Sequence, residues 1–377
     1  MKVAHISYRP SDGVYKKILG QAKAAKKLGL DFEFIVISDD MSKEDEVIQF
    51  HRLILPKGKF LRKIALNFFQ YKAISKSVDL TPYDRIILRY PSSIDLSYRG
   101  FFRKYKDKII TEHNSIMKTE LKTLEVGWLN PLRIFLEHIN SPKLLSEAAG
   151  IIGVTDEIRR FQLGLIKQTK PSTVISNGID VEGIKFTKFK RFDNETLNMI
   201  FVSNTFYPWH GLDRLLEGLM EYEGDININL FLIGEIYRDE ELRMINNMKR
   251  GKINIHALGK HQGDKLDHYY MNSNVAVSSL ALFRINLNEA CVLKTREYIA
   301  RGIPFVYAYE DVDIPEDCRF ALKFRDCDEP IDIQKLIGFV KDVSNRDHLS
   351  EKMREYASGN LDWKYKVTEM YKFASQT

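Results

Sequence analysis

Residues 2–37 read KVAHISYRPSDGVYKKILGQAKAAKKLGLDFEFIVI and place a helical pattern between two short apolar runs. Each run, at residues 2–7 and at 32–37, has the length and apolar character of a buried strand. Between them, after a turn that contains Gly13, apolar residues recur at the helical spacing of Ile18, Leu19, Ala22, Ala25 and Leu28. Strand, turn, helix and strand make a βαβ unit, which predicts a parallel sheet with helices on both faces.

The same pattern continues on both sides of a polar, basic segment at residues 185–198. Before this segment we expect further strands at 85–88, 108–111, 150–154 and 173–176. After it we expect strands at 199–203, 227–233, 253–257, 275–279 and 304–308, with helices at 212–220 and 264–271. A chain of 377 residues is also longer than single cores usually grow. The expected fold class is therefore α/β, with two Rossmann-like parallel-sheet domains facing each other across a cleft.

The expected domain boundary lies near residue 183. Residues 1–182 form the N-terminal domain and residues 183–360 the C-terminal one, with a hinge at 183–198. The last residues, 361–377, carry spaced apolar and aromatic side chains. We expect them to form a closing helix that packs back on the N-terminal domain.

The composition is that of a globular protein, with 44% hydrophobic and 29% charged residues. No stretch approaches 18 consecutive apolar residues and the start lacks the pattern of a signal peptide, so we expect neither membrane spanning nor export. Cys291, Cys318 and Cys327 form no CxxC pair. This favours structural cysteines in a reducing cytoplasm over a disulfide or zinc framework, and we expect a cytoplasmic protein.

Residues 288–302, NEACVLKTREYIARG, are the strongest candidate for a ligand site. A helix at 291–301 would present unpaired N–H groups and a positive dipole end that suit a diphosphate. Lys294 would add a full charge, Glu289 would accept hydrogen bonds from sugar hydroxyls, and Glu297 would bind a ribose diol. The alternative is an ordinary amphipathic helix with solvated charges, because two Glu at this spacing occur about twice by chance in such a chain.

This stretch resembles the donor-site signature of glycosyltransferase family 4 in its paired Glu residues and in residues 293–298 and 300–304. Other segments match that family in the same order along the chain: Gly13-Val14-Tyr15, Thr111-Glu112-His113-Asn114, Ile175-Ser176-Asn177-Gly178-Ile179-Asp180, Phe201-Val202-Ser203 and His210-Gly211-Leu212. The resemblance spans essentially the whole chain, and the ordered set is more specific than any one member.

The resemblance implies a GT-B fold and a metal-independent, retaining glycosyltransferase of the hexosyltransferase type. Its donor would be a sugar linked to UDP or GDP, and no other cofactor is expected. The implied catalytic residues are Glu289 at the donor sugar, His113 and Lys294. The implied donor-binding residues are Gly13 at the phosphates, Gly259, Lys260 and His261 near the base, Glu297 at the ribose, and His210, Cys291, Val292 and Leu293.

One position departs from the family pattern. An Arg and a Lys commonly hold the diphosphate in the first loop of the C-terminal domain, whereas residues 203–211 of this chain contain no such pair. His210 stands where the Lys is expected, either as a phosphate ligand, neutral or charged, or as a core or capping histidine. Lys294 and the helix start would then neutralise more of the diphosphate.

Two further features leave alternatives open. His113 follows a predicted strand and is either a ligand of the donor sugar or leaving group, or a satisfied structural residue. The Asp-x-Asp pairs at 311–313 and 326–328 have the form of a metal site, but about two such pairs are expected by chance. We therefore expect no metal.

Residues 51–110 contain fourteen Lys or Arg residues against four Asp. Within residues 57–77, aromatic and apolar residues recur at helical spacing between the cations, and residues 98–106 form a second basic and aromatic patch. Such a helix either lies on anionic lipid or packs against the core with a solvated basic side. The expected membrane or acceptor face contains Lys59, Arg62, Lys63, Arg103 and Lys104.

The function predicted from these observations is transfer of a sugar to a hydroxyl of a saccharide acceptor in cell-surface polysaccharide biosynthesis. The acceptor would be lipid-linked, with peripheral contact at the inner face of the cell membrane, and nucleic acid is not an expected partner. A nucleotide-sugar 2-epimerase of the same two-domain fold is the main alternative. A non-catalytic nucleotide-sugar sensor or membrane scaffold is a third possibility.

Overall fold

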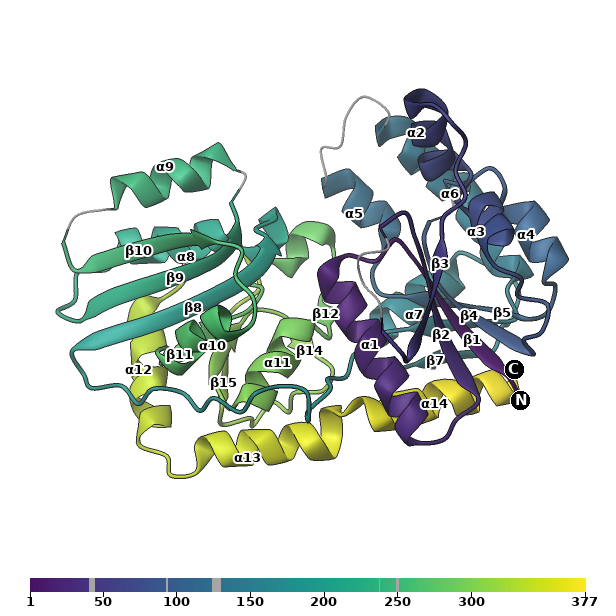
Figure 1. Cartoon of the computed structure of the whole chain (residues 1–377). Helices are drawn as coiled ribbons and strands as arrows, with labels where there is room; N and C mark the ends of the chain where they lie inside the picture. Colours follow the sequence, from purple (N-terminus) through teal and green to yellow (C-terminus); the bar gives the residue numbers. More distant parts are fainter. Residues whose placement is uncertain (41–44, 93, 124–129, 237, 249–250) are drawn as a thin grey trace. The chain divides into compact units, whose positions relative to one another are not determined.

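The computed structural model describes residues 1–40, 45–92, 94–123, 130–236, 238–248 and 251–377. The chain divides into two compact units (Figure 1). Unit 1 contains residues 1–176 and 363–377, and unit 2 contains residues 177–362. No helix in these described ranges is long and apolar enough to cross a lipid bilayer.

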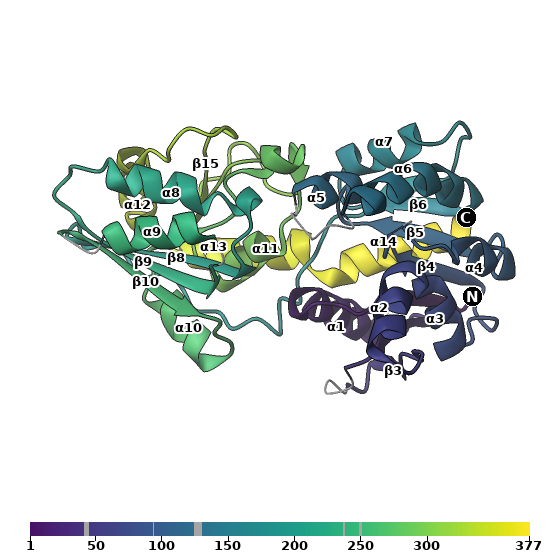
Figure 2. The same cartoon turned by 90° about the horizontal axis from the view of Figure 1, so that it is seen from above.

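Unit 1 is built on a seven-stranded sheet in the order β3-β2-β1-β4-β5-β6-β7, and every neighbouring pair is parallel. The strands are β1 (Val3–Tyr8), β2 (Phe32–Ser38), β3 (Ile48–Arg52), β4 (Arg85–Arg89), β5 (Ile109–His113), β6 (Gly150–Gly153) and β7 (Ser172–Val174). The helices are α1 (Asp12–Lys27), α2 (Lys59–Phe68), α3 (Gln70–Ser77), α4 (Tyr98–Lys104), α5 (Met117–Thr123), α6 (Asn130–Glu147), α7 (Asp156–Gly164) and α14 (Trp363–Gln376). Helices cover both faces of this sheet (Figure 2).

Unit 2 is built on a six-stranded parallel sheet in the order β10-β9-β8-β11-β13-β15. Its strands are β8 (Thr196–Thr205), β9 (Asn227–Glu235), β10 (Ile253–Gly259), β11 (Val275–Val277), β13 (Phe305–Tyr307) and β15 (Ala321–Lys323). A separate two-stranded sheet joins β12 (Glu289–Ala290) to β14 (Glu310–Asp311). The helices are η1 (Pro208–His210), α8 (Leu212–Met220), α9 (Asp239–Asn247), α10 (Asp264–Met271), η2 (Leu282–Ile285), α11 (Leu293–Arg301), α12 (Ile333–Ser344), α13 (Leu349–Tyr356) and η3 (Ala357–Leu361).

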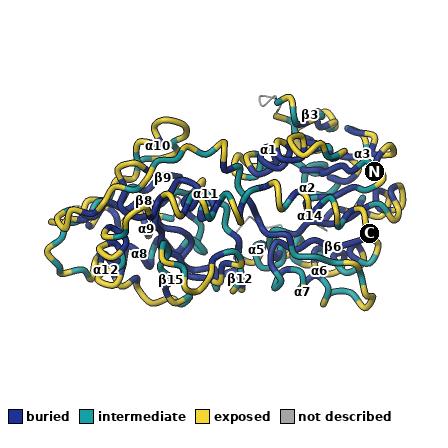
Figure 3. Tube along the Cα trace, turned by 90° about the horizontal axis from the view of Figure 1, so that it is seen from below, coloured by how far each residue is buried: buried dark blue, intermediate teal, exposed yellow. Residues whose placement is uncertain are grey.

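Each unit has its own apolar core, as the buried segments in Figure 3 show. In unit 1 the alternate residues of the strands pack with the aromatic side chains Tyr71, Tyr98, Phe101, Phe102 and Tyr105. In unit 2 the core lies between β8, β9, β11 and the helices α8 and α12. The expected α/β fold class is confirmed.

The polar segment at residues 185–198 belongs to unit 2. The Thr187 N–H donates to Arg301 O at 3.1 Å, the Lys190 N–H donates to Ser273 O at 3.0 Å, and Phe192 lies in the core. The division between the units falls at residues 176 and 177 instead. At the other end of the chain, α14 lies in unit 1, where Met370 accepts a hydrogen bond from Gln21 on α1.

Candidate functional site

The segment before α11 forms the small second sheet of unit 2. β12 pairs in parallel with β14 and places Glu289 opposite Glu310. The chain is still extended at Val292, the N-cap residue of α11, and the helix begins at Leu293. The helix expected from residue 291 therefore starts two residues later, because the residues before it pair with a distant strand.

The first turn of α11 presents backbone N–H groups. The Thr295 N–H donates back to Val292 O at 3.1 Å. Leu293 and Lys294 come before this bond, and N–H groups at these positions of a helix have no acceptor within it. Such a helix start attracts anions, because the dipole adds partial positive charge to the exposed donors.

The side chain of Lys294 brings a titratable amino group to the same place. Its Nζ is covered by protein and has no hydrogen-bond partner among the described residues. Nζ lies over the ring of Phe201 on β8, 5.2 Å from the ring centroid. Burial lowers the pKa of Lys294 from its usual 10.5 to about 7. A covered ammonium group without an acid costs folding free energy, and a bound anion would supply the missing partner.

His210 lies near Lys294 although 84 positions separate them in the sequence. Nδ1 of His210 accepts the Tyr207 N–H at 2.9 Å, which caps η1. Nε2 lies 3.3 Å from Ser203 Oγ. Since the Ser203 hydroxyl donates to Thr205 O at 2.8 Å, Nε2 is the donor in this pair. Burial, followed by the charge of Lys294, holds the pKa of His210 well below its usual range.

These contacts give His210 the capping role that the sequence left open. The imidazole is neutral, so a charged imidazolium is not the form that this site favours. Gly211 follows with φ of 65°, and a Cβ there would lie 2.8 Å from Leu280 Cβ. The loop is therefore fixed by a cap and a required glycine, and Lys294 supplies the positive charge beside it. Phosphate binding by His210 itself stays a prediction.

Glu297 lies one turn further along α11. Its Oε1 accepts from Arg301 Nε at 2.9 Å, and Arg301 Nη1 donates to Asp267 Oδ1 on α10 at 2.7 Å. A carboxylate has a second oxygen, which leaves Glu297 able to accept from a ligand diol. Glu289, on β12, is half-buried.

Arg296 is fully buried on α11, and no pattern in the sequence predicts a role for it. It forms ion pairs with Asp311 and Asp313, and its Nε donates to Asn177 O at 3.2 Å. Asn177 in turn donates from Nδ2 to Cys291 O at 2.8 Å. The first Asp-x-Asp pair is thus engaged by an arginine, and these contacts position the segment that carries Glu289.

Burial raises the pKa of the Cys291 thiol to about 11, and the Asn177 N–H approaches its Sγ at 3.4 Å. This thiol is therefore a protonated structural group, as expected for all three cysteines.

The loop after β10 contains the residues expected near a nucleotide base. Gly259 has φ of 70°, a conformation that favours glycine. Lys260 Nζ pairs with Glu235 Oε2 at 3.0 Å, and the His261 ring stacks on Tyr269 at 5.7 Å between centroids. This loop and η1 follow the carboxyl ends of strands, and Glu235 is the last residue of β9. Parallel sheets bind ligands at this edge.

In unit 1, the residues around β5 form a buried polar network. Glu112 Oε1 accepts from Lys17 Nζ at 2.8 Å, and Oε2 lies 3.1 Å from His5 Nε2. Lys17 also donates to Asn114 Oδ1 at 2.7 Å. Although burial opposes ionisation, the charge of Lys17 and the bond to His5 hold the pKa of Glu112 well below its usual range. Lys17 and His5 carried no recognisable signal, because their partner lies about 100 positions away.

His113, at the end of β5, is 1% exposed. Its Nε2 lies 3.0 Å from Thr111 Oγ1, and its ring lies 4.5 Å from that of Tyr90. Its Nδ1 has no partner among the described residues. Burial lowers the pKa of His113 to about 3, so the imidazole is neutral. At Gly13, an added Cβ would meet nothing within 4 Å, so the packing of unit 1 does not require glycine there.

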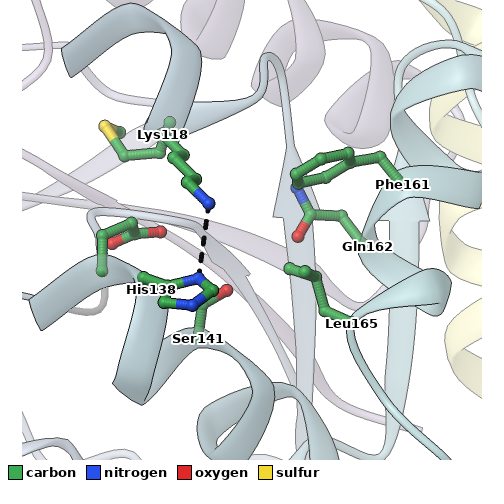
Figure 4. A pocket seen from close by; sticks show the side chains of 8 residues that line it. Lys118, His138, Ser141, Phe161, Gln162 and Leu165 are labelled. Carbon is green, nitrogen blue, oxygen red and sulfur yellow. Dashed lines mark hydrogen bonds between the residues drawn. The ribbon is translucent and has the colours of Figure 1, made fainter. Parts of the chain in front are cut away.

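A pocket in unit 1 lies between α5, α6 and α7 (Figure 4). Lys118 Nζ lies 3.3 Å from His138 Nδ1 across part of it, and Gln162 and Leu165 line the opposite side. Its volume of about 20 Å³ holds roughly one water molecule. It is too small for a sugar.

Comparison with solved structures identifies the architecture. The sucrose-phosphate synthase of Thermosynechococcus elongatus matches with a TM-score of 0.69 at 14% identity, over 100% of this chain and 98% of that chain. The fold is GT-B. The GT-B glycosyltransferase WaaG, involved in lipopolysaccharide biosynthesis, matches at 0.61 and 14% identity over the whole of both chains. HepE of Anabaena matches at 0.62 and 12% over the whole of both chains. No family model and no curated protein sequence matches this GT-B chain.

Proposed function

We propose that the chain is a retaining glycosyltransferase that moves a sugar from a nucleotide-diphosphate sugar to a hydroxyl of a saccharide acceptor. The single observation that carries this proposal is the ammonium of Lys294 at the start of α11, which is covered by protein and has no hydrogen-bond partner within the described part of the chain. The site has the charge and the N–H donors for a diphosphate, and it lies on the carboxyl side of a parallel sheet.

The fold neighbours support a nucleotide sugar as the donor. HepE has been crystallised with UDP-glucose and with UDP and glucose, and starch synthase IV of Arabidopsis thaliana with ADP and acarbose. Each of these chains has the fold of this one at 12% identity. For this chain we propose UDP or GDP as the leaving group.

In the proposed mechanism, Lys294 and the first N–H groups of α11 bind the diphosphate, Glu297 accepts from the ribose diol, and Glu289 accepts from the donor sugar. The acceptor oxygen forms the new bond to the anomeric carbon on the face from which the diphosphate departs. The carbon–oxygen bond to the diphosphate breaks, and the leaving oxygen takes the acceptor proton. Preorganised positive charge then acts on the leaving group as its negative charge develops. For His113 we keep the predicted role as a ligand of the donor sugar or the leaving group.

We also propose that neither a metal nor another cofactor takes part. The ion pairs of Asp311 and Asp313 with Arg296 support this, because both carboxylates of that Asp-x-Asp pair are already engaged. The acceptor is proposed to be a lipid-linked saccharide of cell-surface polysaccharide biosynthesis.

The test is incubation of the full chain with UDP-, GDP- and ADP-sugars, with and without a lipid-linked acceptor and with and without EDTA. We expect acceptor-dependent release of one nucleoside diphosphate, unchanged by EDTA, and a product with the donor's anomeric configuration by NMR. Inversion at C2 of the donor sugar without an acceptor would instead identify the epimerase. If the protein binds nucleotide but turns over no substrate, the result would instead favour a non-catalytic nucleotide-sugar sensor.

Glu289→Gln and Glu310→Gln form a matched pair for this assay, because the two residues face each other in the β12–β14 sheet. We expect Glu289→Gln to lower transfer about a hundredfold or more while nucleotide diphosphate affinity stays. Glu310 pairs with Lys323 and is exposed, so Glu310→Gln leaves both unchanged. Full transfer by Glu289→Gln would refute its assignment.

A further inference from the structure

α2 contacts the core of unit 1 through the partly buried Leu66, and the first half of the helix is more open to solvent. None of its ten residues is buried, and Phe60 and Leu61 are 74% and 55% exposed. Three of its residues are cations, Lys59, Arg62 and Lys63, and none is acidic. Monomeric soluble proteins rarely leave large apolar side chains together on one surface unless that surface binds something.

α6 carries a second exposed apolar stripe that the sequence analysis did not identify. Leu132, Phe135 and Ile139 are 45%, 58% and 38% exposed. Their spacing of three and then four residues places them on one face of the helix. The exposed Lys143 continues that face by one turn, while Leu144 and Leu145 face the core.

Both helices lie at the carboxyl edge of the unit 1 sheet. α2 follows β3, and α6 follows β5 and α5, so each is reached from the carboxyl end of a strand. In Figure 1, α2 and the first turns of α6 extend to the same end of the unit. The other basic and aromatic patch, at 98–106, differs, because its side chains Tyr98, Phe101, Phe102 and Tyr105 are buried in the core. Its cations, including Arg103 and Lys104, are exposed.

We propose that α2 and the first half of α6 form a surface that docks unit 1 on an anionic lipid bilayer. Phe60, Leu61 and Phe135 would enter the boundary between headgroups and acyl chains, while Lys59 and Lys63 contact lipid phosphates. This docking surface extends the proposed function and rests on it in one respect, because a lipid-linked acceptor is held in a bilayer.

Charge favours a bilayer over a second copy of the chain. In a two-fold symmetric contact centred on α2, the same surface would face itself, so the cations of one helix would meet those of the other. Arg62 is paired with Asp39 at 2.8 Å, but no ion pair is recorded for Lys59 or Lys63 among the described residues. An anionic surface would neutralise both.

The experiment is flotation of the full chain with phosphatidylcholine vesicles that contain or lack phosphatidylglycerol. We expect binding to the anionic vesicles only, weakened by salt. The double variant Lys59→Gln/Lys63→Gln should weaken this binding about thirtyfold, since each cation near the surface contributes about fivefold. Phe60→Ser/Leu61→Ser should weaken it on the order of a hundredfold.

Arg103→Gln/Lys104→Gln removes the same charge from the exposed side of α4 in the same unit and is the matched control. We expect it to retain most of the anionic-vesicle binding. Equal loss in this control and in Lys59→Gln/Lys63→Gln would overturn the assignment to α2. Undiminished vesicle binding by Phe60→Ser/Leu61→Ser would also overturn it. The same holds if the wild-type protein does not bind anionic vesicles and instead self-associates through these residues.

The same samples are scanned thermally with UDP and GDP. Normal stabilisation of Phe60→Ser/Leu61→Ser by nucleotide, together with lost flotation, supports the docking surface and excludes misfolding. If no nucleotide stabilises any variant but flotation follows the expected order, the donor proposal fails and the docking surface stands.

Discussion

A lysine ammonium that is covered by protein atoms and has no acidic partner is an unfavourable feature of a folded chain. Among the residues that the structure describes, no acid pairs with Lys294. The neighbours of Lys294 do not offset the free-energy cost of burying its ammonium group, whereas a bound anion would. Phe201 offers a ring face, and His210 is neutral and fully occupied as a cap. The charge of Lys294 is therefore available for a ligand.

Replacing Lys294 with Met should separate stability from binding. We expect Lys294→Met to unfold at an equal or higher temperature than wild type, because an uncompensated buried charge is removed. Its affinity for the nucleoside diphosphate should fall at least about thirtyfold in calorimetric titration. Lys335→Met is the control, since Lys335 Nζ also lies over a phenylalanine ring, 5.4 Å from Phe324, but on an exposed lysine. Unchanged affinity in Lys294→Met would remove the lysine from the site.

The lowered pKa of Lys294 predicts how stability depends on pH. Between pH 7 and the ordinary value of 10.5, the folded chain holds fewer protons at Lys294 than the unfolded chain does. The free energy of unfolding of wild type should therefore rise with pH relative to that of Lys294→Met, by at most about 1.4 kcal/mol per pH unit. Urea unfolding of both proteins at about pH 6.5, 8 and 9 measures this difference in unfolding free energy. A constant difference would contradict it.

At the scale of elements, Arg296 joins α11 to two other segments of unit 2. The guanidinium contacts Asp311 and Asp313 near β14 and the carbonyl of Asn177. Its removal takes the paired positive charge away from the buried carboxylate of Asp311. Arg296→Met should therefore destabilise unit 2 by about 3–5 kcal/mol in urea unfolding.

Arg346→Met is the matched control for this prediction. Arg346 pairs with Asp342 on the surface of α12, where such pairs contribute little. We expect a change below about 1 kcal/mol. Similar losses of unfolding free energy in the two variants would show that the buried ion pairs of Arg296 contribute no more to stability than a surface pair.

The elements also show what the sequence was able to predict. Helices α8 and α10 occupy the residues expected from their apolar spacing, because local periodicity determines them. Strand β3 was missed, since Ile48–Arg52 alternates with polar residues at the edge of the sheet and lacks a continuous apolar run. The later start of α11 depends on pairing between β12 and β14, which no local pattern reveals.

The site shows the same division between local and distant information. Residues 288–302 were recognised from a motif, and so was the charge of Lys294. Arg296, Lys17 and His5 were not, because a buried charged residue is explained only by partners that are distant in the sequence. The burial of Phe101 and Phe102 also reversed the reading of a basic aromatic patch as a surface, since periodicity does not say which side of a helix faces the core.

At the scale of the whole molecule, the C-terminal helix belongs to the unit that contains the N-terminus. Trp363, Val367, Met370 and Ala374 of α14 are buried, and α14 packs on α1. Deletion of residues 363–377 should therefore destabilise unit 1 by several kcal/mol. Each large side chain that loses its buried environment contributes about 1.5–3 kcal/mol to this loss. Limited proteolysis should cut unit 1 first, while nucleotide still protects unit 2. Equal cleavage of both units would contradict this division.

The central claim is that a nucleoside diphosphate binds at the start of α11. Hydrogen exchange of the full chain, followed by mass spectrometry with and without UDP or GDP, tests it most directly. We predict slower exchange in peptides that contain the amides of Leu293 and Lys294, and loss of this protection in Lys294→Met but not in Lys335→Met. Nucleotide binding that leaves exchange at these amides unchanged would contradict the account.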